Sequence, residues 1–185
     1  KFDILLTKPN FLRKIKILIV ILLFGSIKDF LKRINNKISI SEIIEKNEQC
    51  KVVTKITEKY DFGLSVYCSS KIQVENFKIY NFHLGSLKNQ RGSFIFFYKF
   101  INDWKSVFLT FHEISERFDV GEIINEREIK LNENTTATDI FFVYLNNMDF
   151  LCKSIDKIEN GQRKNYKNFE KLNLVPSFIK LFREI

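Results

Sequence analysis

The fold is decided by a stretch that joins two apolar patterns, "GSFIFFYKFINDWKSVFLTFHEI", residues 92–114. Its first half is almost continuously apolar, which is typical of a central strand buried on both faces. Its second half alternates, so that Val107, Leu109 and Phe111 would share one face of another strand. Asn102-Asp103, between the two halves, is a residue pair that favours a tight hairpin turn. The stretch therefore predicts two antiparallel strands.

Strand patterns continue on both sides of this stretch. They occupy residues 52–60, 62–68, 71–84 and 126–131. In the second of these segments, alternation would place Phe62, Leu64, Val66 and Cys68 on one inner face. Together the segments predict about five or six strands in mainly antiparallel order.

A helical pattern follows the strands. From residue 139 to about 160, apolar residues recur at spacings of three and four. Thr138 or Asp139 can cap this helix and Gly161 can end it. The run "IFFVYL", residues 140–145, would also suit a strand, which leaves a local alternative open. Pro176 then opens a last short helix.

The N-terminal segment 11–35 is the most apolar part of the chain. Eleven uncharged residues, Ile17–Ile27, lie between Lys16 and Lys28. As a helix they would span about 16 Å, whereas the hydrocarbon core of a bilayer is about 30 Å thick. We therefore expect a helix that is buried or docked on a partner. A membrane-inserted or interfacial helix and a targeting remnant remain alternatives.

These patterns predict an α+β fold. It would comprise an N-terminal hydrophobic and amphipathic helix, a mainly antiparallel sheet of about five or six strands, and C-terminal helices packed on one face. The expected organisation is an N-terminal helical extension over residues 1–46, with a further short helix at 39–46, and an α+β domain over residues 47–185. Within that domain the sheet would occupy 51–131 and the helices 139–185.

Composition points to an unusual genome. The chain has 20 Phe but only 6 Gly and 2 Pro, and Ala137 is its one alanine. Folding gives no reason to exclude alanine, the best helix former, so we read the skew as AT-rich codon usage. Three cysteines without a CxxC motif favour a reducing compartment, although a Cys50–Cys68 bridge remains an alternative. We expect a mitochondrial location, in the matrix or at the inner-membrane face.

The residues that could carry catalysis are few. His83 and His112 both lie in predicted strands, and Glu113 would point away from His112. The carboxylates Asp61, Asp103, Glu113, Glu116 and Asp119 have no spacing that predicts a catalytic pair, and no phosphate-binding loop is present. We therefore expect no enzyme activity, cofactor, metal site or small-molecule substrate. A cavity where either histidine meets a carboxylate and a bound small molecule would overturn this expectation.

The net charge of +8 favours polyanionic partners. Basic residues cluster near the N-terminus, in a predicted turn and in a late connector, and Tyr166 could stack on a base. The ten candidate nucleic-acid contacts are Lys8, Arg13, Lys14, Lys16, Lys88, Arg91, Arg163, Lys164, Tyr166 and Lys167.

These features together lead to two functional hypotheses. The first is a non-catalytic structural subunit of a large organellar assembly, best described as an RNA-contacting ribosomal protein from an AT-rich, mitochondrial-type genome. Its partners would be rRNA and neighbouring protein subunits. The alternative is a membrane-associated accessory subunit of a respiratory or ATP-synthase complex, anchored through residues 15–34 with membrane contact at Ile17–Ile27.

Overall fold

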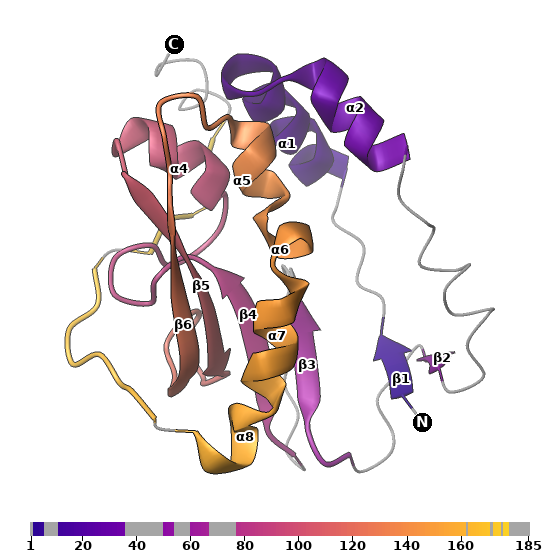
Figure 1. Ribbon diagram of the computed structural model, residues 1–185, viewed down its shortest axis with the longest axis vertical. Coiled ribbons are helices and arrows are strands. Elements are labelled where there is room, and N and C mark those ends of the chain that lie inside the picture. Colours follow the sequence, from indigo (N-terminus) through magenta and orange to yellow (C-terminus); the bar gives the residue numbers. More distant parts are fainter. Residues whose placement is uncertain are drawn as a thin grey trace.

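The computed structural model describes residues 2–5, 11–35, 50–53, 60–66, 77–161, 163–170, 172–174 and 176–177. These residues form an α+β fold with helices on both sides of an open, mixed sheet (Figure 1). The sheet has the order β3 (Gly63–Val66), β4 (Ile79–Leu84), β5 (Ser106–Glu113) and β6 (Ile123–Lys130). A separate parallel pair is formed by β1 (Phe2–Leu5) and β2 (Cys50–Val53).

The predicted α+β class is confirmed, whereas the predicted strand count is wrong. In the described part of the chain the sheet has four strands instead of five or six. β3 and β4 run parallel, and the β4–β5 and β5–β6 pairs are antiparallel. The sheet is smaller than expected because one predicted strand is a helix and because β2, where the first predicted strand begins, pairs with β1 instead.

That helix is α4 (Ile95–Ile101), in the segment predicted as the central strand. Its first four residues are all buried. The ring of Phe24 stacks on Phe100 at 5.0 Å and meets Phe97 edge-on at 6.0 Å between centroids. A short continuous apolar run fits a helix buried on all sides as well as a strand, so packing against other helices decides between them. Asn102-Asp103 is a turn, but it joins a helix to β5.

One face of the sheet is apolar and carries the C-terminal helices. Val107, Leu109 and Phe111 are fully buried, which confirms the predicted alternation. The helix predicted over 139–160 is a series of short helices along this face, broken at single residues: α5 (Ala137–Phe141), α6 (Val143–Asn146), α7 (Met148–Ile155) and α8 (Lys157–Asn160).

The ends of this helical series differ slightly from the prediction. Its first helix begins two residues earlier than expected, at a capping box in which Thr136 and Asp139 each bind the other's backbone N–H. Gly161 ends the series, as predicted. The packing onto the sheet is aromatic, since the rings of Phe82 and Phe150 lie 5.9 Å apart.

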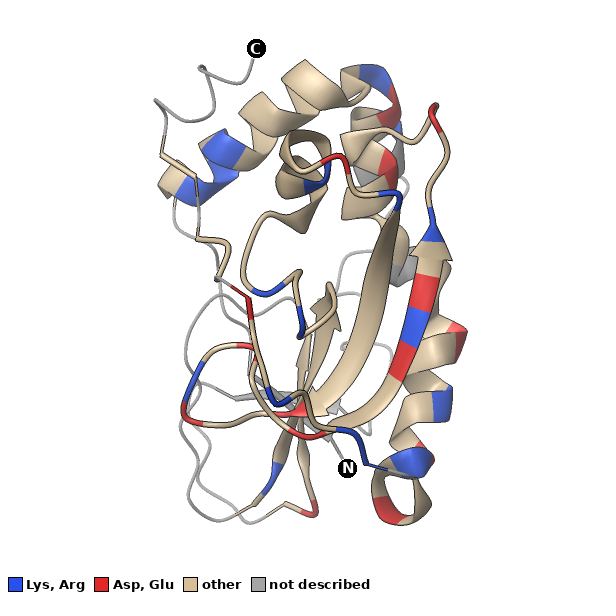
Figure 2. Ribbon diagram, turned by 90° about the vertical axis from the view of Figure 1, so that its left-hand side faces the viewer, with Lys and Arg blue, Asp and Glu red and all other residues tan. Residues whose placement is uncertain are grey.

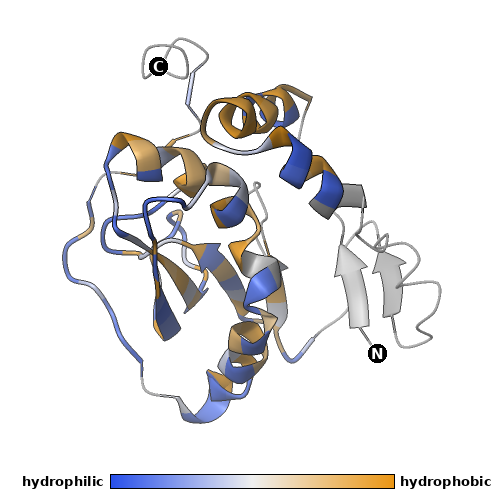
Figure 3. Ribbon diagram, turned by 45° about the horizontal axis from the view of Figure 1, so that its top comes forward, coloured by the Kyte–Doolittle hydropathy of each residue, from blue (hydrophilic) through white to orange (hydrophobic). Residues whose placement is uncertain are grey.

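The apolar N-terminal segment is helical, as predicted, with a break at Gly25-Ser26. It forms α1 (Phe11–Phe24), apolar along nearly all of its length, and the more polar α2 (Ile27–Asn35) (Figure 3). Ile17, Val20 and Ile21 are buried in the same core as the sheet. None of the described helices combines the length and the apolar character needed to cross a membrane.

Some predictions fall outside the described residues. These are the short helix at 39–46, the domain boundary at residue 46, the position of Cys68 and nearly all of the last helix after Pro176. The division into an extension and a domain therefore stays a prediction.

Leu64 and Val66, predicted to be buried, are 43% and 47% exposed because β3 is an edge strand of the described sheet. Ser65 between them is buried instead. Burial in an edge strand depends on what covers it as well as on alternation.

Candidate active site: a histidine–carboxylate cluster

The face of β4 and β5 away from the apolar core carries polar side chains. Asn81 and His83 are two residues apart on β4, so both point to this face. Asn81 lies opposite His112 and His83 lies opposite Thr110 on β5. This register brings the two histidine rings together, with centroids 6.3 Å apart and planes nearly perpendicular.

His83 meets a carboxylate. Nδ1 of His83 lies 3.5 Å from Oδ1 of Asp119, in the loop between β5 and β6, and the two side chains are only 7% and 11% exposed. Nε2 of His83 lies 3.0 Å from the carbonyl oxygen of Gln90. Because a carbonyl oxygen only accepts, Nε2 donates, and a further proton can be held between Nδ1 and Asp119. This pair can therefore take up or release a proton at a defined place.

Backbone contacts hold Asp119 in place. The N–H of Gly92 donates to Oδ2 of Asp119 at 2.6 Å, which leaves Oδ1 toward His83. The guanidinium of Arg91 donates to the carbonyl oxygens of Asp119, Phe118 and Glu170 at 2.9 to 3.0 Å. Burial lowers the pKa of Arg91 and the nearby Asp119 carboxylate opposes that shift. The guanidinium of Arg91 thus holds the backbone of the residue that carries the carboxylate.

His112 is the second buried histidine of the cluster. Burial, followed by the nearby His83, lowers the pKa of His112 from 6.5 to about 4, so the ring is neutral near pH 7. Nδ1 of His112 donates to the carbonyl oxygen of Glu113 at 2.9 Å. Nε2 lies 3.3 Å from Nδ2 of Asn81. The ring thus links the backbone of β5 to the side chain of Asn81.

A glycine permits the turn that closes on His83. Gly85 has φ +132°, a conformation that L side chains rarely adopt. A Cβ atom there would lie 2.1 Å from the carbonyl oxygen of Gln90 and 2.9 Å from Nε2 of His83. Only glycine lets the backbone carbonyl reach the histidine ring.

The five carboxylates considered as catalytic candidates lie in different surroundings. Asp119 faces a histidine, whereas Asp61 and Glu116 are exposed. Asp103 pairs with Lys105, whose hydrogen bond lowers the pKa of Asp103. Glu113 pairs with Lys78 and raises the pKa of Lys78 in the same way. Among the described residues no group of three or more His, Cys, Asp and Glu side chains could hold a metal ion.

Nine of the ten basic and aromatic candidates lie in the described residues, and they differ in exposure. Lys8 lies outside the described residues; Lys14, Lys88, Arg163, Lys164 and Lys167 are exposed, and Arg13, Lys16, Arg91 and Tyr166 are partly buried. Lys and Arg are scattered among Asp and Glu along the ribbon (Figure 2).

Several of these residues make intramolecular contacts. Arg13 lies over the ring of Phe94, Arg163 pairs with Glu122, and Lys164 and Tyr166 both bind Glu126 at 3.0 Å. Hydrogen bonds to Tyr166 and Glu126 raise the pKa of Lys164. Contact of any of the ten with nucleic acid is untested and stays a prediction.

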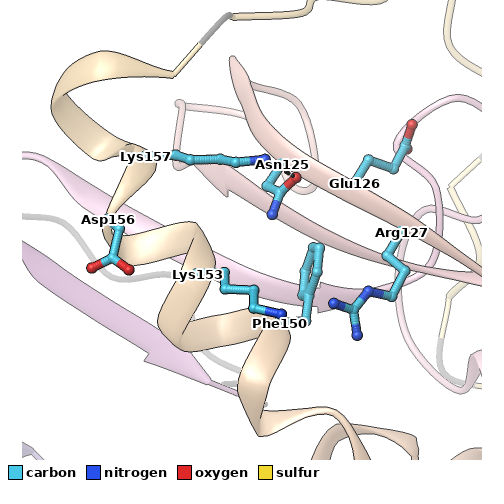
Figure 4. A pocket seen from close by; sticks show the side chains of 7 residues that line it. All are labelled: Asn125, Glu126, Arg127, Phe150, Lys153, Asp156 and Lys157. Carbon is cyan, nitrogen blue, oxygen red and sulfur yellow. Dashed lines mark hydrogen bonds between the residues drawn. The ribbon is translucent and has the colours of Figure 1, made fainter.

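A groove of about 440 Å³ lies elsewhere, between β6 and α7 (Figure 4). Its lining residues are Asn125, Glu126, Arg127, Phe150, Lys153, Asp156 and Lys157. Arg127 pairs with Asp149 at 3.1 Å, and its hydrogen bond lowers the pKa of that carboxyl. Lys157 donates to Asn125 at 3.0 Å. The groove shares no residue with the histidine cluster.

The sequence did contain a signal for the cluster. Asn81 and His83 alternate on one predicted strand, and Asp119 precedes Gly121 by two residues. Asn81 and His112 are 31 residues apart in sequence and meet only because β4 pairs with β5, so spacing along the chain does not reveal their contact. The expectation of no catalytic pair rested on such spacing, which does not reveal contacts of this kind.

Comparisons with known proteins give this cluster a context. No family model matches the chain. Over 137 residues the chain is 27% identical to the dTDP-4-amino-4,6-dideoxyglucose formyltransferases of Mycobacterium bovis and Mycobacterium tuberculosis. The match covers 71% of this chain and 58% of each relative. The chain thus spans less than two thirds of the length of these curated relatives.

Solved structures of formyltransferases are also similar to this chain. The sugar 3N-formyltransferase WlaRD, determined in the presence of dTDP and 5-N-formyl-THF, matches with a TM-score of 0.59 and 25% identity, covering 74% of this chain and 53% of that one. An N-formyltransferase from Helicobacter canadensis, in complex with folinic acid and dTDP-3-aminofucose, matches with a TM-score of 0.52 and 25% identity, covering 74% and 49%. A 4-N formyltransferase from Francisella tularensis shares the fold at 23% identity and a TM-score of 0.56, covering 80% and 61%.

These likenesses overturn the functional predictions made from composition. A non-catalytic ribosomal or RNA-binding subunit, a membrane-associated accessory subunit, and rRNA as partner are all wrong, because the relatives are named as enzymes. The absence of a small-molecule substrate is also wrong as an expectation, since the similar structures bind folates and dTDP-sugars. In sequence and in fold, the chain is most usefully compared with sugar N-formyltransferases.

Proposed function

We propose that this chain carries the formyl-transfer site of a sugar N-formyltransferase. The donor would be a formyltetrahydrofolate and the acceptor the amino group of a dTDP-linked amino sugar. Support comes from the 27% identity to dTDP-4-amino-4,6-dideoxyglucose formyltransferases and from the fold shared with enzymes that bind these two ligand classes.

The histidine cluster has the chemistry that such a transfer requires. When bound, the folate would supply a formyl group attached to nitrogen. As the acceptor amine forms its new bond to the formyl carbon, the bond from that carbon to the folate nitrogen would break. The acceptor amine loses a proton and the released folate nitrogen gains one, so the His83–Asp119 pair is placed to take up the first proton and return it to the leaving nitrogen. Asn81 has amide N–H groups that can donate to an oxygen on which negative charge develops. The residue types present therefore fit the donor and the acceptor.

The observation that carries the proposal is the pairing of His83 with Asp119. Two charged or polar groups that are both about nine-tenths buried and 3.5 Å apart are costly to a fold unless they stabilise each other. A histidine held against a carboxylate is a side chain that can act as a general acid or base toward a bound substrate.

The test is an assay of formyl transfer by the purified chain. A formyltetrahydrofolate and a panel of dTDP-linked amino sugars are incubated with the protein, and mass spectrometry detects an acceptor heavier by one formyl group. His83→Gln keeps a donor for the carbonyl oxygen of Gln90 but loses the nitrogen that faces Asp119. We expect the rate to fall by about 100-fold or more, because general acid–base catalysis contributes that much. A folded chain that formylates none of these acceptors, or a fully active His83→Gln variant, would contradict the proposal.

The compartment is a separate matter. We propose a reducing, mitochondrial location on composition alone, and the formyl-transfer proposal does not depend on it.

A further inference from the structure

We propose that His112 is a positioning residue, which fixes the orientation of the Asn81 side-chain amide by accepting a hydrogen bond from its Nδ2 atom. The inference rests on the proposed function, because it gives the amide a role in formyl transfer. It concerns a residue that does not touch the His83–Asp119 pair through a hydrogen bond and that the proposed proton transfer leaves unused.

The side chain of His112 is enclosed by two strands and a loop. The residue is 1% exposed on β5, directly opposite Asn81 on β4. On the loop side Gly121 packs so closely that an added Cβ would lie 3.3 Å from Nδ1 of His112 and 1.9 Å from the carbonyl oxygen of Glu113. The ring is therefore held between the two strands and the loop.

The hydrogen-bond partners determine where the ring carries its proton. Nδ1 lies 2.9 Å from the carbonyl oxygen of Glu113, which can only accept, so Nδ1 carries a hydrogen. A neutral ring has one N–H group, so Nε2 is left with its lone pair. Burial and the neighbouring His83 keep the ring neutral near pH 7, against the opposing effect of Asp119.

An acceptor at Nε2 decides how the amide of Asn81 faces. Nδ2 of Asn81 lies 3.3 Å from this nitrogen and can donate to it. The reversed amide would bring an oxygen against a lone pair, which is repulsive. One N–H and the amide oxygen of Asn81 are then left for other partners, in a fixed orientation, and a fixed donor stabilises developing charge without having to reorient.

The experiment compares two replacements of His112 in the full chain. His112→Gln places an amide oxygen close to the position of Nε2 and can still accept from Asn81. His112→Phe fills the space but offers no acceptor. Steady-state kinetics of formyl transfer are measured for both variants, with and without Asn81→Ala, and ¹⁵N NMR reports the tautomer of His112 in the wild-type chain.

We expect the Nδ1–H tautomer at pH 7. We also expect kcat to fall about tenfold in His112→Phe, the loss associated with one hydrogen bond, with KM nearly unchanged. His112→Gln should recover most of that loss. In the Asn81→Ala background the two His112 variants should have equal kcat, because there is no longer an amide to orient.

Three results would overturn the inference. These are an Nε2–H tautomer, equal kcat for His112→Gln and His112→Phe with Asn81 intact, and a loss in His112→Phe that persists undiminished with Asn81→Ala. Each of them can occur in a chain that transfers formyl groups normally, and then only the role of His112 is wrong. A wild-type chain with no formyl transfer at all instead contradicts the proposed function, and the positioning role is overturned with it.

Discussion

At the scale of single residues, Asp119 illustrates how the backbone prepares the site. It has φ 49°, in the left-handed region, which aspartate tolerates better than most residues because its short side chain can bind the local backbone. Asp103 has nearly the same φ angle, 48°, but its carboxylate is exposed and pairs with Lys105. What distinguishes the two is burial against His83, so the same local structure serves a turn in one place and the candidate site in the other.

His112 should make stability depend on pH. In the folded chain its pKa is lowered to about 4, whereas the unfolded value is 6.5. Between these values the unfolded state binds a proton that the folded state does not bind, so stability is complete above pH 6.5 and falls as pH drops toward 4. Over this window the loss is about 3 kcal/mol, at about 1.4 kcal/mol per pH unit.

His112→Gln removes the titrating group and should flatten this dependence by a similar amount. Urea unfolding of both proteins at a series of pH values between about 7 and about 4 measures the effect. If the unfolding free energies of the two proteins fall equally steeply as the pH is lowered, His112 is not held neutral by burial.

At the scale of elements, three segments far apart in sequence converge on the candidate site. They are the turn after β4, the loop between β5 and β6, and the connector that follows α8. The connector lies beside the turn after β4 and beside the start of β6, where the loop ends, since Asn173 bridges to Gly92 and Lys164 bridges to Ile123. The connector was predicted as a basic surface for RNA, yet its Lys164 and Tyr166 both contact Glu126 of β6.

Arg91 should be the residue that couples these three segments. Its guanidinium donates through three nitrogens to three carbonyl oxygens, a planar geometry that one lysine ammonium cannot reproduce. Arg91→Lys should lower the free energy of unfolding by about 2 kcal/mol, as expected for about two lost hydrogen bonds. Two backbone amides should also exchange their hydrogens faster. They are the N–H of Gly92, which donates to the carboxylate of Asp119, and the N–H of Asn173, which donates to the backbone carbonyl oxygen of Arg91.

Arg117→Lys is the matched control, because it makes the same change at an exposed position of the neighbouring loop. Hydrogen exchange and denaturant unfolding of both variants measure the difference. If both replacements leave the exchange of Gly92 and Asn173 as it is in the wild type, Arg91 does not hold the segments together.

At the scale of the whole molecule, the sequence predicted what local patterns determine. Alternation identified β5 with its buried Val107, Leu109 and Phe111, and spacings of three and four identified the helices after residue 136. Residues 95–101 were assigned to the wrong element, because a fully apolar run has no periodicity to separate strand from buried helix.

The candidate site could not be predicted in the same way. His83 and Asp119 are brought together by the pairing of β4 with β5 and by the loop beyond it, which are long-range features. Net charge and codon usage favoured RNA as the partner, although the side chains of Arg91 and Lys164 make hydrogen bonds within the chain. Net charge describes the surface and carries no information on which side chains meet in the interior.

We propose that the His83–Asp119 pair moves the proton in formyl transfer, and two aspartate variants give the sharpest check of its role. Asp119→Asn and Asp103→Asn make the same replacement at two aspartates whose φ angles, 49° and 48°, are nearly equal. Formyl transfer to a dTDP-linked amino sugar is measured for both. We predict that Asp119→Asn lowers the rate by about 100-fold or more and that Asp103→Asn leaves it unchanged, because of these two aspartates it is Asp119 that faces His83. Equal rates in the two variants would show that the His83–Asp119 pair has no part in the reaction.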